Sequence, residues 1–374
     1  MGTPKTDLRG VLRRWGRLGL FGVGGPQAHT ALLRERMVER EGWMSARDFQ
    51  DVVAATSLLP GPASTQLAIY CARLAGGPVG GVVGGLAFIL PGFVLIVALS
   101  ALFLNHPESS ALRGAAAGAV SAAVTVIAAA GIGFARGIGA RHGFALARAV
   151  AYALAAGLVT VLSGPWVLAV LLGAGLIELA LRLRAPSAAA AVAAAHASAP
   201  GLVWLAFKVG ALSFGGGLVI IPLMQHDVVS VHHWLSERQF ADAVALGQLT
   251  PGPVVLTVAV VGYAASGVGG AALAAAVAFL PSFLFVMLGA GRFEELRRRP
   301  GPRAFLDGAG PAAVGAIFGA AVLLAPQALA TWWQPLVVVI AALLLLVGRS
   351  TFLALVLGLA LGLAAGLAGL PLPG

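Results

Sequence analysis

The sequence predicts an all-α, polytopic integral membrane protein made of two homologous helical repeats. The chain has 374 residues, of which 59% are hydrophobic and only 10% are charged, whereas about 25% are charged in ordinary soluble domains. Apolar runs of about 18 residues or more recur along most of its length, as a hydrocarbon core roughly 30 Å thick requires of spanning helices. The third observation is an internal duplication.

The stretch from Trp43 to Pro62, WMSARDFQDVVAATSLLPGP, recurs as Trp234 to Pro253, WLSERQFADAVALGQLTPGP, at an offset of 234 − 43 = 191 residues. Eleven of the 20 aligned positions are identical, where chance would give roughly one or two, so the chain carries an internal repeat. We therefore predict a basic cytoplasmic arm at 1–17, a first repeat at 18–184, an Ala-rich linker at 185–200 and a second repeat at 201–370.

Two pairs of aligned motifs interrupt apolar segments. A helix cannot pass intact through Pro60-Gly61-Pro62 or Pro251-Gly252-Pro253, because proline lacks an N–H group and disfavours helical geometry in the residue before it. Gly24 and Gly25 align with Gly215 and Gly216 and predict a second pair of breaks, although such glycines also permit close helix packing. Broken or re-entrant helices in corresponding places of two halves point to a transporter's binding site.

The elements follow the same order in both halves. The arm carries Lys5, Arg9, Arg13, Arg14 and Arg17 against Asp7. In the first half we expect a charge-neutral loop at Arg34–Asp48. The apolar segments expected in this half are Leu18–Leu33, Asp51–Tyr70, Val79–Leu104 with a bend at Pro91, Leu112–Phe134, Ala149–Leu162 and Pro165–Leu183. The second half predicts Leu202–Met224, Asp242–Tyr263, Val268–Ala290, Ala304–Ala325, Leu336–Val347 and Phe352–Leu367.

The net charge of +10 does not indicate a nucleic-acid-binding protein, because the basic residues form short clusters between apolar runs. Such clusters set topology and anchor headgroups. They fall out of phase between the halves, which predicts inverted repeats with one re-entrant or doubled segment in each. We expect a multi-pass protein of the inner (plasma) membrane without a cleavable signal peptide. The lone Cys71 excludes an intramolecular disulfide and a thiolate metal cluster.

Each broken helix predicts an anion site, because the continuing half exposes unpaired N–H groups and the positive end of its macrodipole. We expect free donors at Ala63, Ser64 and Thr65 in the first half and at Val254, Val255 and Leu256 in the second, where Thr257 is also near. The predicted substrate-binding residues are Gly24, Gly25, Pro26, Gln27, Pro60, Gly61, Pro62, Ser64, Thr65, Gln66, Gly215, Gly216, Gly217, Gln248, Thr250, Pro251, Gly252 and Pro253.

Five residues are candidates for charge or proton coupling. Arg17 and Lys208 align before the glycine breaks and could attract an anion or reach the interface by snorkelling. Asp51 and Asp242 align at the start of the second broken segment, where an acid either caps a helix or takes part in proton coupling. His29 follows the first glycine break and titrates near physiological pH.

No soluble-enzyme signature is present in the sequence. Gly22-Val23-Gly24 lies in an apolar segment without the strand or spacing of a dinucleotide loop, and no GxxxxGK[ST] motif occurs. The adjacent His232 and His233 lack the i, i+4 spacing of a helical zinc pair. We therefore predict no cofactor, no metal site and no enzymatic activity.

These motifs resemble the chromate ion transporter family in its long, two-domain form. The first half carries GGP before the charged loop, then W-x-S-x-x-x-F and LLPGPASTQLA, and the second carries SFGGG, W-L-S-x-x-x-F and Q-L-T-P-G-P. The resemblance covers roughly residues 15–180 and 200–370, and LLPGPASTQ is highly specific. Val23 departs from the family pattern, which more often has Phe there, as at Phe214; we expect only a modest effect on packing.

The resemblance implies a secondary transporter, an antiporter that exports chromate against protons and confers chromate resistance. Chromate is a tetrahedral dianion close to sulfate in size and charge, so a transporter of sulfate or other oxyanions, importing or exporting, stays an alternative. An intramembrane enzyme acting on lipid or isoprenoid substrates would need a centre rich in carboxylates or histidines, and Asp51, Asp242 and Glu178 are too few and too scattered to form one. A channel is disfavoured, since no rings of pore-lining charge accompany the broken helices. The many small residues would also suit a homodimer.

Overall fold

The structure is a computed structural model that describes residues 6–23, 25–59, 61–139, 143–183, 201–213, 217–289 and 300–373. Regular structure in these ranges is helical throughout, without strands. Five helices are long and apolar enough to cross a membrane, namely Ala63–Asn105, Ser110–Arg136, Gly143–Ser163, Val254–Gly289 and Ala304–Ala328. The predicted class, an all-α polytopic membrane protein, is confirmed.

The chain forms two compact units, and each unit takes segments from both halves of the sequence. The first comprises Met1–Ala101, Leu202–Gly217 and Thr250–Arg299, and the second comprises Leu102–Gly201, Leu218–Leu249 and Pro300–Gly374. Neither unit therefore coincides with one of the two sequence repeats. The predicted linker at 185–200 lies outside the described residues.

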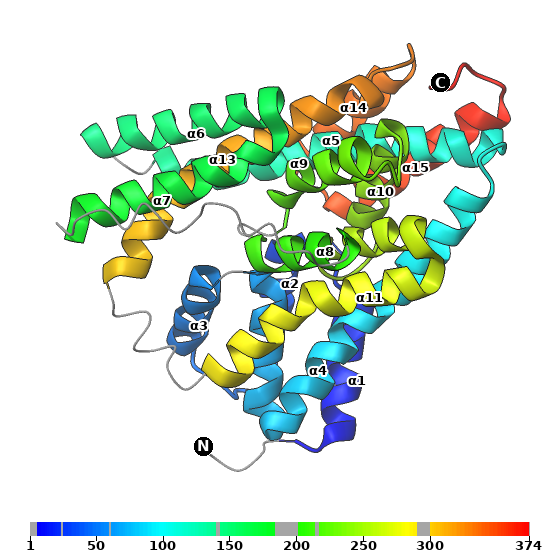
Figure 1. Cartoon of the computed structure of the whole chain (residues 1–374). Helices are drawn as coiled ribbons and strands as arrows, with labels where there is room; N and C mark the ends of the chain where they lie inside the picture. Colours follow the sequence, from blue (N-terminus) through cyan, green and yellow to red (C-terminus); the bar gives the residue numbers. More distant parts are fainter. Residues whose placement is uncertain are drawn as a thin grey trace. The chain divides into compact units, whose positions relative to one another are not determined.

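The first unit contains most of the elements that surround the sequence motifs (Figure 1). They are α1 (Leu8–Phe21), α2 (Gly25–Arg34), the π-helical turn η1 (Glu35–Arg40), α3 (Ala46–Leu58), most of α4 (Ala63–Asn105), α8 (Gly201–Leu212), the 3₁₀ turn η4 (Val254–Leu256) and α11 (Thr257–Gly289). η1 lies within the stretch Arg34–Asp48, which the sequence predicts as a loop.

Most of the predicted N-terminal arm belongs to helix α1. The side chain of Asp7 caps α1 by accepting a 2.9 Å hydrogen bond from the Gly10 N–H. Val11 and Trp15 are fully buried, and the Trp15 indole donates to the Ala68 carbonyl of α4 at 2.8 Å. The arginines of the arm are therefore carried by a helix that packs into the first unit.

Helices α4 and α11 each consist of two helices joined by a tight turn (Figure 1). The backbone leaves helical geometry at Gly76 and Gly77 in α4 and at Ser266 and Gly267 in α11. Residues 63–75 would span about 20 Å, less than the roughly 30 Å hydrocarbon core, which favours a re-entrant half-helix. The helix continues through Pro91 with helical backbone angles, and the bend at that residue stays a prediction.

The W-x-S-x-x-x-F motif starts a helix in both halves. Ser45 Oγ accepts a 3.0 Å hydrogen bond from the Asp48 N–H at the start of α3. Ser236 Oγ accepts from the Gln239 N–H at 3.2 Å, and Gln239 Oε1 accepts from the Ser236 N–H at 2.9 Å, which forms a capping box. Capping by Asp51 and Asp242 was therefore a wrong alternative, because both lie well inside their helices.

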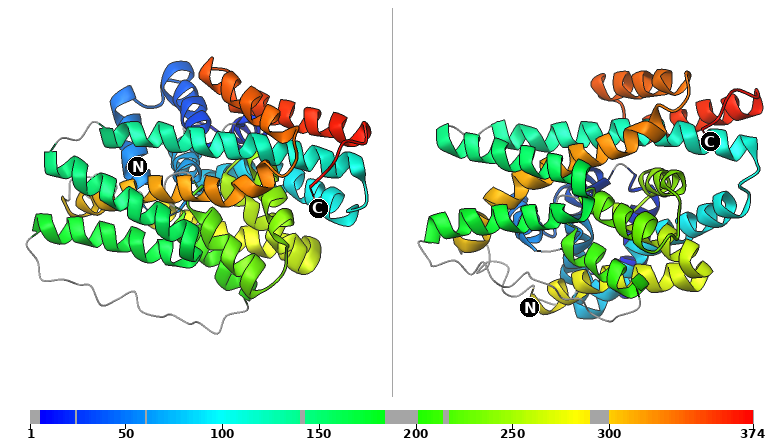
Figure 2. Two further views of the ribbon diagram at one scale, coloured as in Figure 1. Left: turned by 90° about the horizontal axis from the view of Figure 1, so that it is seen from above. Right: turned by 45° about the horizontal axis from the view of Figure 1, so that its top comes forward.

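The second unit contains the remaining helices (Figure 2). They are α5 (Ser110–Gly139), α6 (Gly143–Ser163), η2 (Gly164–Trp166), α7 (Val167–Leu183), α9 (Ile220–Gln225), η3 (His226–Val231), α10 (Glu237–Leu249), α13 (Pro300–Ala328), α14 (Gln334–Leu346) and α15 (Thr351–Leu367). α13 packs against α5, α6 and α7, and α15 packs along α5.

Small residues bring α5 and α15 into close contact. A methyl group on Gly118 would overlap the Gly358 carbonyl, and one on Gly362 would overlap the Gly114 carbonyl. Such glycine rows let membrane helices approach at backbone distance. An ion pair between Arg148 and the buried Glu178, 2.7 Å from Nε to Oε1, also lies in this unit.

The backbone of His233 is strained, and a glycine at this position would remove the strain. Among described non-glycine residues only His233 has a positive φ, 54°, while the aligned Gly42 has 60°. A side chain in this region costs roughly 1–2 kcal/mol, so we expect His233→Gly to raise the thermal unfolding midpoint of the detergent-solubilised protein. The control is His232→Gly, since His232 has a φ of −100° and stacks on Trp234. A midpoint raised equally by both substitutions would contradict the strain argument.

Candidate functional site

The first Pro-Gly-Pro motif separates two helices of the first unit. Helix α3 ends at Leu58 and α4 begins at Ala63. Gly61 has a φ of 114°, a conformation that essentially only glycine adopts. The predicted interruption is confirmed, although Pro60 itself lies outside the described residues.

The second motif interrupts the chain in the same way. Helix α10 ends at Leu249, and a short 3₁₀ turn at Val254–Leu256 precedes α11. Gly252 has a φ of 99°, close to that of the aligned Gly61. Both breaks therefore depend on a glycine flanked by prolines.

The predicted free donors are only partly available. The Pro62 carbonyl accepts hydrogen bonds from the N–H groups of Thr65 at 2.9 Å and Gln66 at 3.1 Å, and the Pro253 carbonyl accepts from Leu256 at 2.9 Å. Free donors at Thr65 and Leu256 were therefore wrong predictions, because the last proline of each motif keeps a carbonyl that starts the next turn.

Polar side chains surround the first break. A methyl group on Gly61 would lie 2.7 Å from Gln66 Nε2, 2.9 Å from Ser282 Oγ and 3.3 Å from the Gly210 carbonyl. Thr65 and Ser282 are fully buried, and their hydroxyl oxygens make no hydrogen bond within the part of the chain that is described. Buried hydroxyls are rarely left in this state, so both hydroxyls can donate a hydrogen bond to a bound group.

The second break is packed and hydrogen-bonded instead. The Gly252 N–H donates to the Gly22 carbonyl at 3.0 Å, and His29 Nε2 lies 2.8 Å from the same oxygen. The His29 ring packs edge-on against Phe88, with 5.0 Å between ring centroids. A methyl group on Gly92 would overlap the Pro251 carbonyl. These contacts give the second break a structural role, although the buried atoms Ser213 Oγ and Gln248 Nε2 nearby also make no hydrogen bond among the described residues.

Ser282 was missed in the sequence-based prediction. It follows Pro281 in AFLPSF, at the position that Gly92 holds after Pro91 in AFILPGF. Each break thus faces the helix of the other half: Gly61 faces Ser282, and Pro251 faces Gly92. A hydroxyl immediately after a proline in an apolar helix was the available signal, and only the duplicated comparison with Gly92 would have singled it out.

The glycine breaks are described only in part. Gly24, Gly215 and Gly216 lie outside the described residues, as does the side chain of Gln27. Gly25 begins α2 with a φ of 73°, and the Thr30 hydroxyl donates to the Pro26 carbonyl at 2.8 Å. Gly217 has a φ of 93° and lies near Val254, Val255 and the Ser213 hydroxyl.

The predicted substrate-binding residues are not confined to one of the two units. Residues 250–253 and 61–66 belong to the first unit, whereas Gln248 lies in the last turn of α10 in the second unit. Ser64 is buried next to the first break, and Thr250 is buried next to the second. The first unit therefore contains both Pro-Gly-Pro motifs.

The charged candidates lie in different surroundings. Arg17 is exposed on α1 and lines a pocket with other arginines. Lys208 lies over the Trp204 ring, with 5.8 Å from Nζ to the ring centroid. Asp51 is partly buried in α3.

Two candidates outside the five candidate spans have shifted pKa values. Burial raises the pKa of Asp242 to about 7, against the opposing effect of the Arg238 charge one helical turn away. Burial lowers the pKa of His29, although its hydrogen bond to the Gly22 carbonyl partly offsets this effect. Asp242 can therefore change charge near neutral pH, while His29 is mostly neutral there.

A family model described as "Chromate transporter" matches the chain at residues 10–179 and again at 201–368. The chain belongs to the chromate transporter family. Members of this family are transport proteins, so the chain is a multi-pass membrane transport protein and not an enzyme.

Curated members of the chromate transporter family are similar over most of the chain. The chromate transport protein of Cupriavidus metallidurans is 34% identical, covering 92% of this chain and 89% of the relative. The chromate transport protein of Pseudomonas aeruginosa is 33% identical, covering 84% and 80%. A probable chromate transport protein of Synechococcus elongatus is 30% identical, covering 87% and 86%. No solved structure matches the chain.

Proposed function

We propose that this chain is a secondary transporter that exports chromate across the inner (plasma) membrane in exchange for protons and so confers chromate resistance. The observation that supports an anionic substrate is the polar surroundings of the first break. There the N-terminus of α4 meets the buried hydroxyls of Ser64, Thr65 and Ser282. The names of the relatives support chromate as the anion.

The chemistry of this break suits a tetrahedral dianion. Hydroxyl and backbone donors next to a helix N-terminus bind an anion without a formal positive charge, so the anion can also be released. Each hydrogen bond to a charged ligand contributes about 1.5–3 kcal/mol. The same donors would accept sulfate, and a general oxyanion transporter therefore stays the second candidate.

We propose that the proton is bound by a residue outside the anion site. Asp242 is a stronger candidate than His29, because its pKa of about 7 allows it to bind and release a proton near neutral pH. Arg17, Lys208 and Asp51 stay predictions for charge coupling.

The experiment is a flux assay on purified protein in sealed vesicles, with labelled chromate, with or without a pH gradient and with excess sulfate. We expect chromate flux that a pH gradient drives and that sulfate reduces only weakly. Flux abolished by sulfate would favour the general oxyanion transporter. No chromate flux from folded protein would contradict the proposed function.

Two substitutions test the position of the site. Thr65→Val and Ser282→Ala each remove one buried hydroxyl, and we expect each to lower chromate flux at least tenfold. The matched control is Thr160→Val in the second unit, because Thr160 is also fully buried with a hydroxyl that lacks a partner among the described residues. Normal flux in a well-expressed double variant Thr65→Val/Ser282→Ala would place the site elsewhere.

A further inference from the structure

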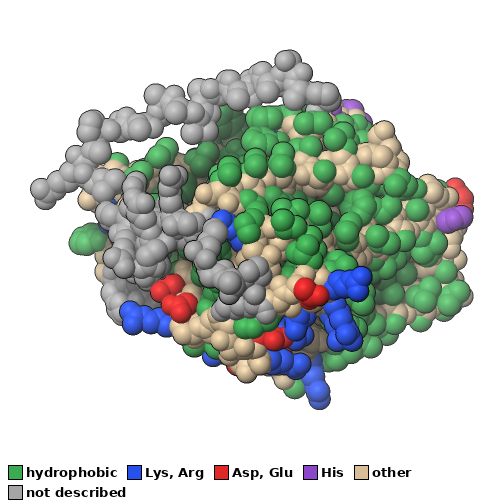
Figure 3. All heavy atoms as spheres, turned by 90° about the horizontal axis from the view of Figure 1, so that it is seen from below, with side chains coloured by type: hydrophobic (Ala, Val, Ile, Leu, Met, Phe, Trp, Pro, Cys, Tyr) green, Lys and Arg blue, Asp and Glu red, His purple; other side chains and the backbone are tan. Residues whose placement is uncertain are grey.

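An open, basic pocket of about 360 Å³ lies on the first unit, apart from the Pro-Gly-Pro breaks. Its volume is within the range of small-ligand sites, about 300–1,000 Å³. The charged residues that line it are Arg9, Arg13, Arg14, Arg17, Arg36 and Glu41. Five positive charges and one negative charge leave a net charge of +4. Figure 3 shows Lys and Arg side chains gathered on one face, close to acidic and hydrophobic ones.

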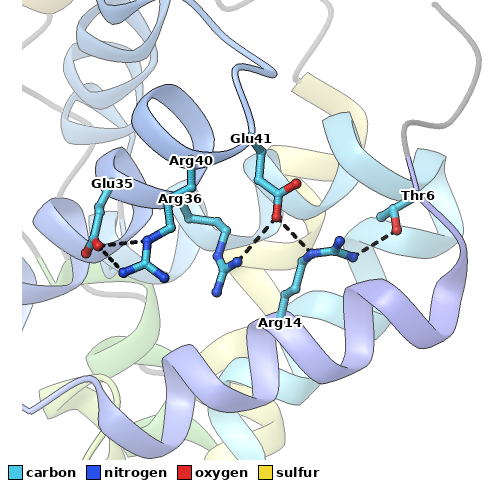
Figure 4. Close-up of polar contacts among 6 residues, drawn as sticks. All are labelled: Thr6, Arg14, Glu35, Arg36, Arg40 and Glu41. Atoms are coloured by element: carbon cyan, nitrogen blue, oxygen red, sulfur yellow. Dashed lines mark hydrogen bonds and ion pairs between the residues drawn. The ribbon is translucent and has the colours of Figure 1, made fainter.

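Two of the five arginines are held by the glutamate (Figure 4). Glu41 Oε1 accepts from Arg14 Nε at 3.1 Å and from an Arg36 terminal nitrogen at 3.3 Å. Arg14 also donates to the Thr6 hydroxyl at 3.0 Å. Glu41 thus holds the side chains of Arg14 and Arg36 in place, while the pocket as a whole stays positively charged.

The other three arginines form one row on α1. Arg9, Arg13 and Arg17 are spaced four residues apart, so they lie above one another on one side of the helix. All three are exposed, and within the described residues none makes an ion pair with a carboxylate. Their charges are available to a ligand in the pocket.

An apolar row runs beside the arginine row. Leu8 and Leu12 lie one above the other on α1, about 100° around the helix from Arg9 and Arg13, and they are 44% and 54% exposed. The side of α1 opposite the arginines is buried through Val11 and Trp15. A helix with exposed leucines next to arginines is typical of the boundary between headgroups and acyl chains.

We propose that this pocket binds the phosphate group of an anionic phospholipid. The planar guanidinium groups of Arg9, Arg13 and Arg17 can donate paired hydrogen bonds to phosphate oxygens. The exposed leucine row contacts the acyl chains of the same lipid. A free phosphate ion offers the same oxygens, but it has no acyl chains to contact the leucine side chains.

The test titrates the full-length protein in detergent with phosphatidylglycerol, phosphatidylcholine or inorganic phosphate, and reads bound ligand by native mass spectrometry. We expect binding of phosphatidylglycerol and little binding of phosphatidylcholine. Near a membrane surface each arginine contributes about fivefold to the binding of anionic lipid. Arg9→Gln/Arg13→Gln should therefore weaken phosphatidylglycerol binding more than tenfold.

The matched control removes the same charge elsewhere on this unit. Arg34→Gln/Arg40→Gln disrupts the exposed ion pairs to Glu39 and Glu35, outside the pocket, and should change affinity less than threefold. Equal losses in both double variants, or no loss in Arg9→Gln/Arg13→Gln, would overturn the proposal. Inorganic phosphate that binds as tightly as the lipid, with the same dependence on Arg9 and Arg13, would support a phosphate site whose ligand is a soluble anion.

Discussion

Gly61→Ala is expected to lower chromate flux roughly hundredfold, whereas Gly252→Ala is expected to lower it much less. Both glycines have positive φ values, 114° and 99°, so both substitutions impose a similar backbone strain, about 1–3 kcal/mol. The added methyl groups meet different surroundings. At Gly61 the methyl would lie between Gln66 Nε2 at 2.7 Å and Ser282 Oγ at 2.9 Å, but at Gly252 its nearest neighbour is Leu256 Cδ1 at 3.4 Å.

The difference between the two variants isolates the polar site from the backbone effect. If the methyl displaces two donors from the anion, about 3 kcal/mol or more is lost, which corresponds to a flux lowered roughly hundredfold. The measurement is initial chromate flux in vesicles, normalised to folded protein. Equal flux in the two variants would show that the first break has no special role in binding.

A second-site variant separates steric overlap from loss of donors. Gly61→Ala/Ser282→Gly gives the methyl group room near residue 282, as Gly92 does opposite the second break. We expect flux to stay low, because the hydroxyl is absent. Recovery to the wild-type rate would mean that Gly61→Ala acts only through packing.

Asp242→Asn is expected to uncouple chromate movement from the pH gradient. The pKa of Asp242 is raised to about 7 by burial, so the carboxyl group is largely protonated at pH 5 and ionised at pH 9. Asparagine imitates the protonated form at every pH. Wild-type flux should therefore change with pH around a midpoint near 7, while the variant should give a flat profile and lose gradient-driven accumulation but keep chromate exchange.

The matched control is Asp227→Asn, which removes another partly buried carboxylate of the same unit and should leave the pH profile unchanged. Gradient-driven accumulation by Asp242→Asn would rule out the proposed role of this residue.

Thermal stability gives an independent readout of the same group. Because the folded-state pKa of Asp242 is raised, the folded protein binds more protons than the unfolded chain between the ordinary pKa of an aspartate and about 7. Stability should fall as pH rises through that interval. This part of the pH dependence should be absent in Asp242→Asn.

The sequence determined the helical class, the membrane setting, the family and the two Pro-Gly-Pro breaks. These follow from local chemistry: long apolar runs must form spanning helices in a bilayer, and a Pro-Gly-Pro motif cannot continue a helix. It placed the starts of the next segments at Asp51 and Asp242, more than one helical turn after the observed starts of α3 at Ala46 and α10 at Glu237. It did not identify Ser45 and Ser236 as the caps of these helices, because the aligned acids Asp51 and Asp242 were expected at the helix starts.

The sequence already makes the first break the more polar of the two, because Ser64, Thr65 and Gln66 follow its motif where Val254, Val255 and Leu256 follow the second. Only the tertiary structure adds the residues that are distant in sequence: Ser282 next to Gly61, and the carbonyl of Gly22 next to Gly252. Ser282 and Gly61 are 282 − 61 = 221 positions apart. Contacts over such separations depend on how α4, α8 and α11 pack, and a local sequence pattern does not specify that packing.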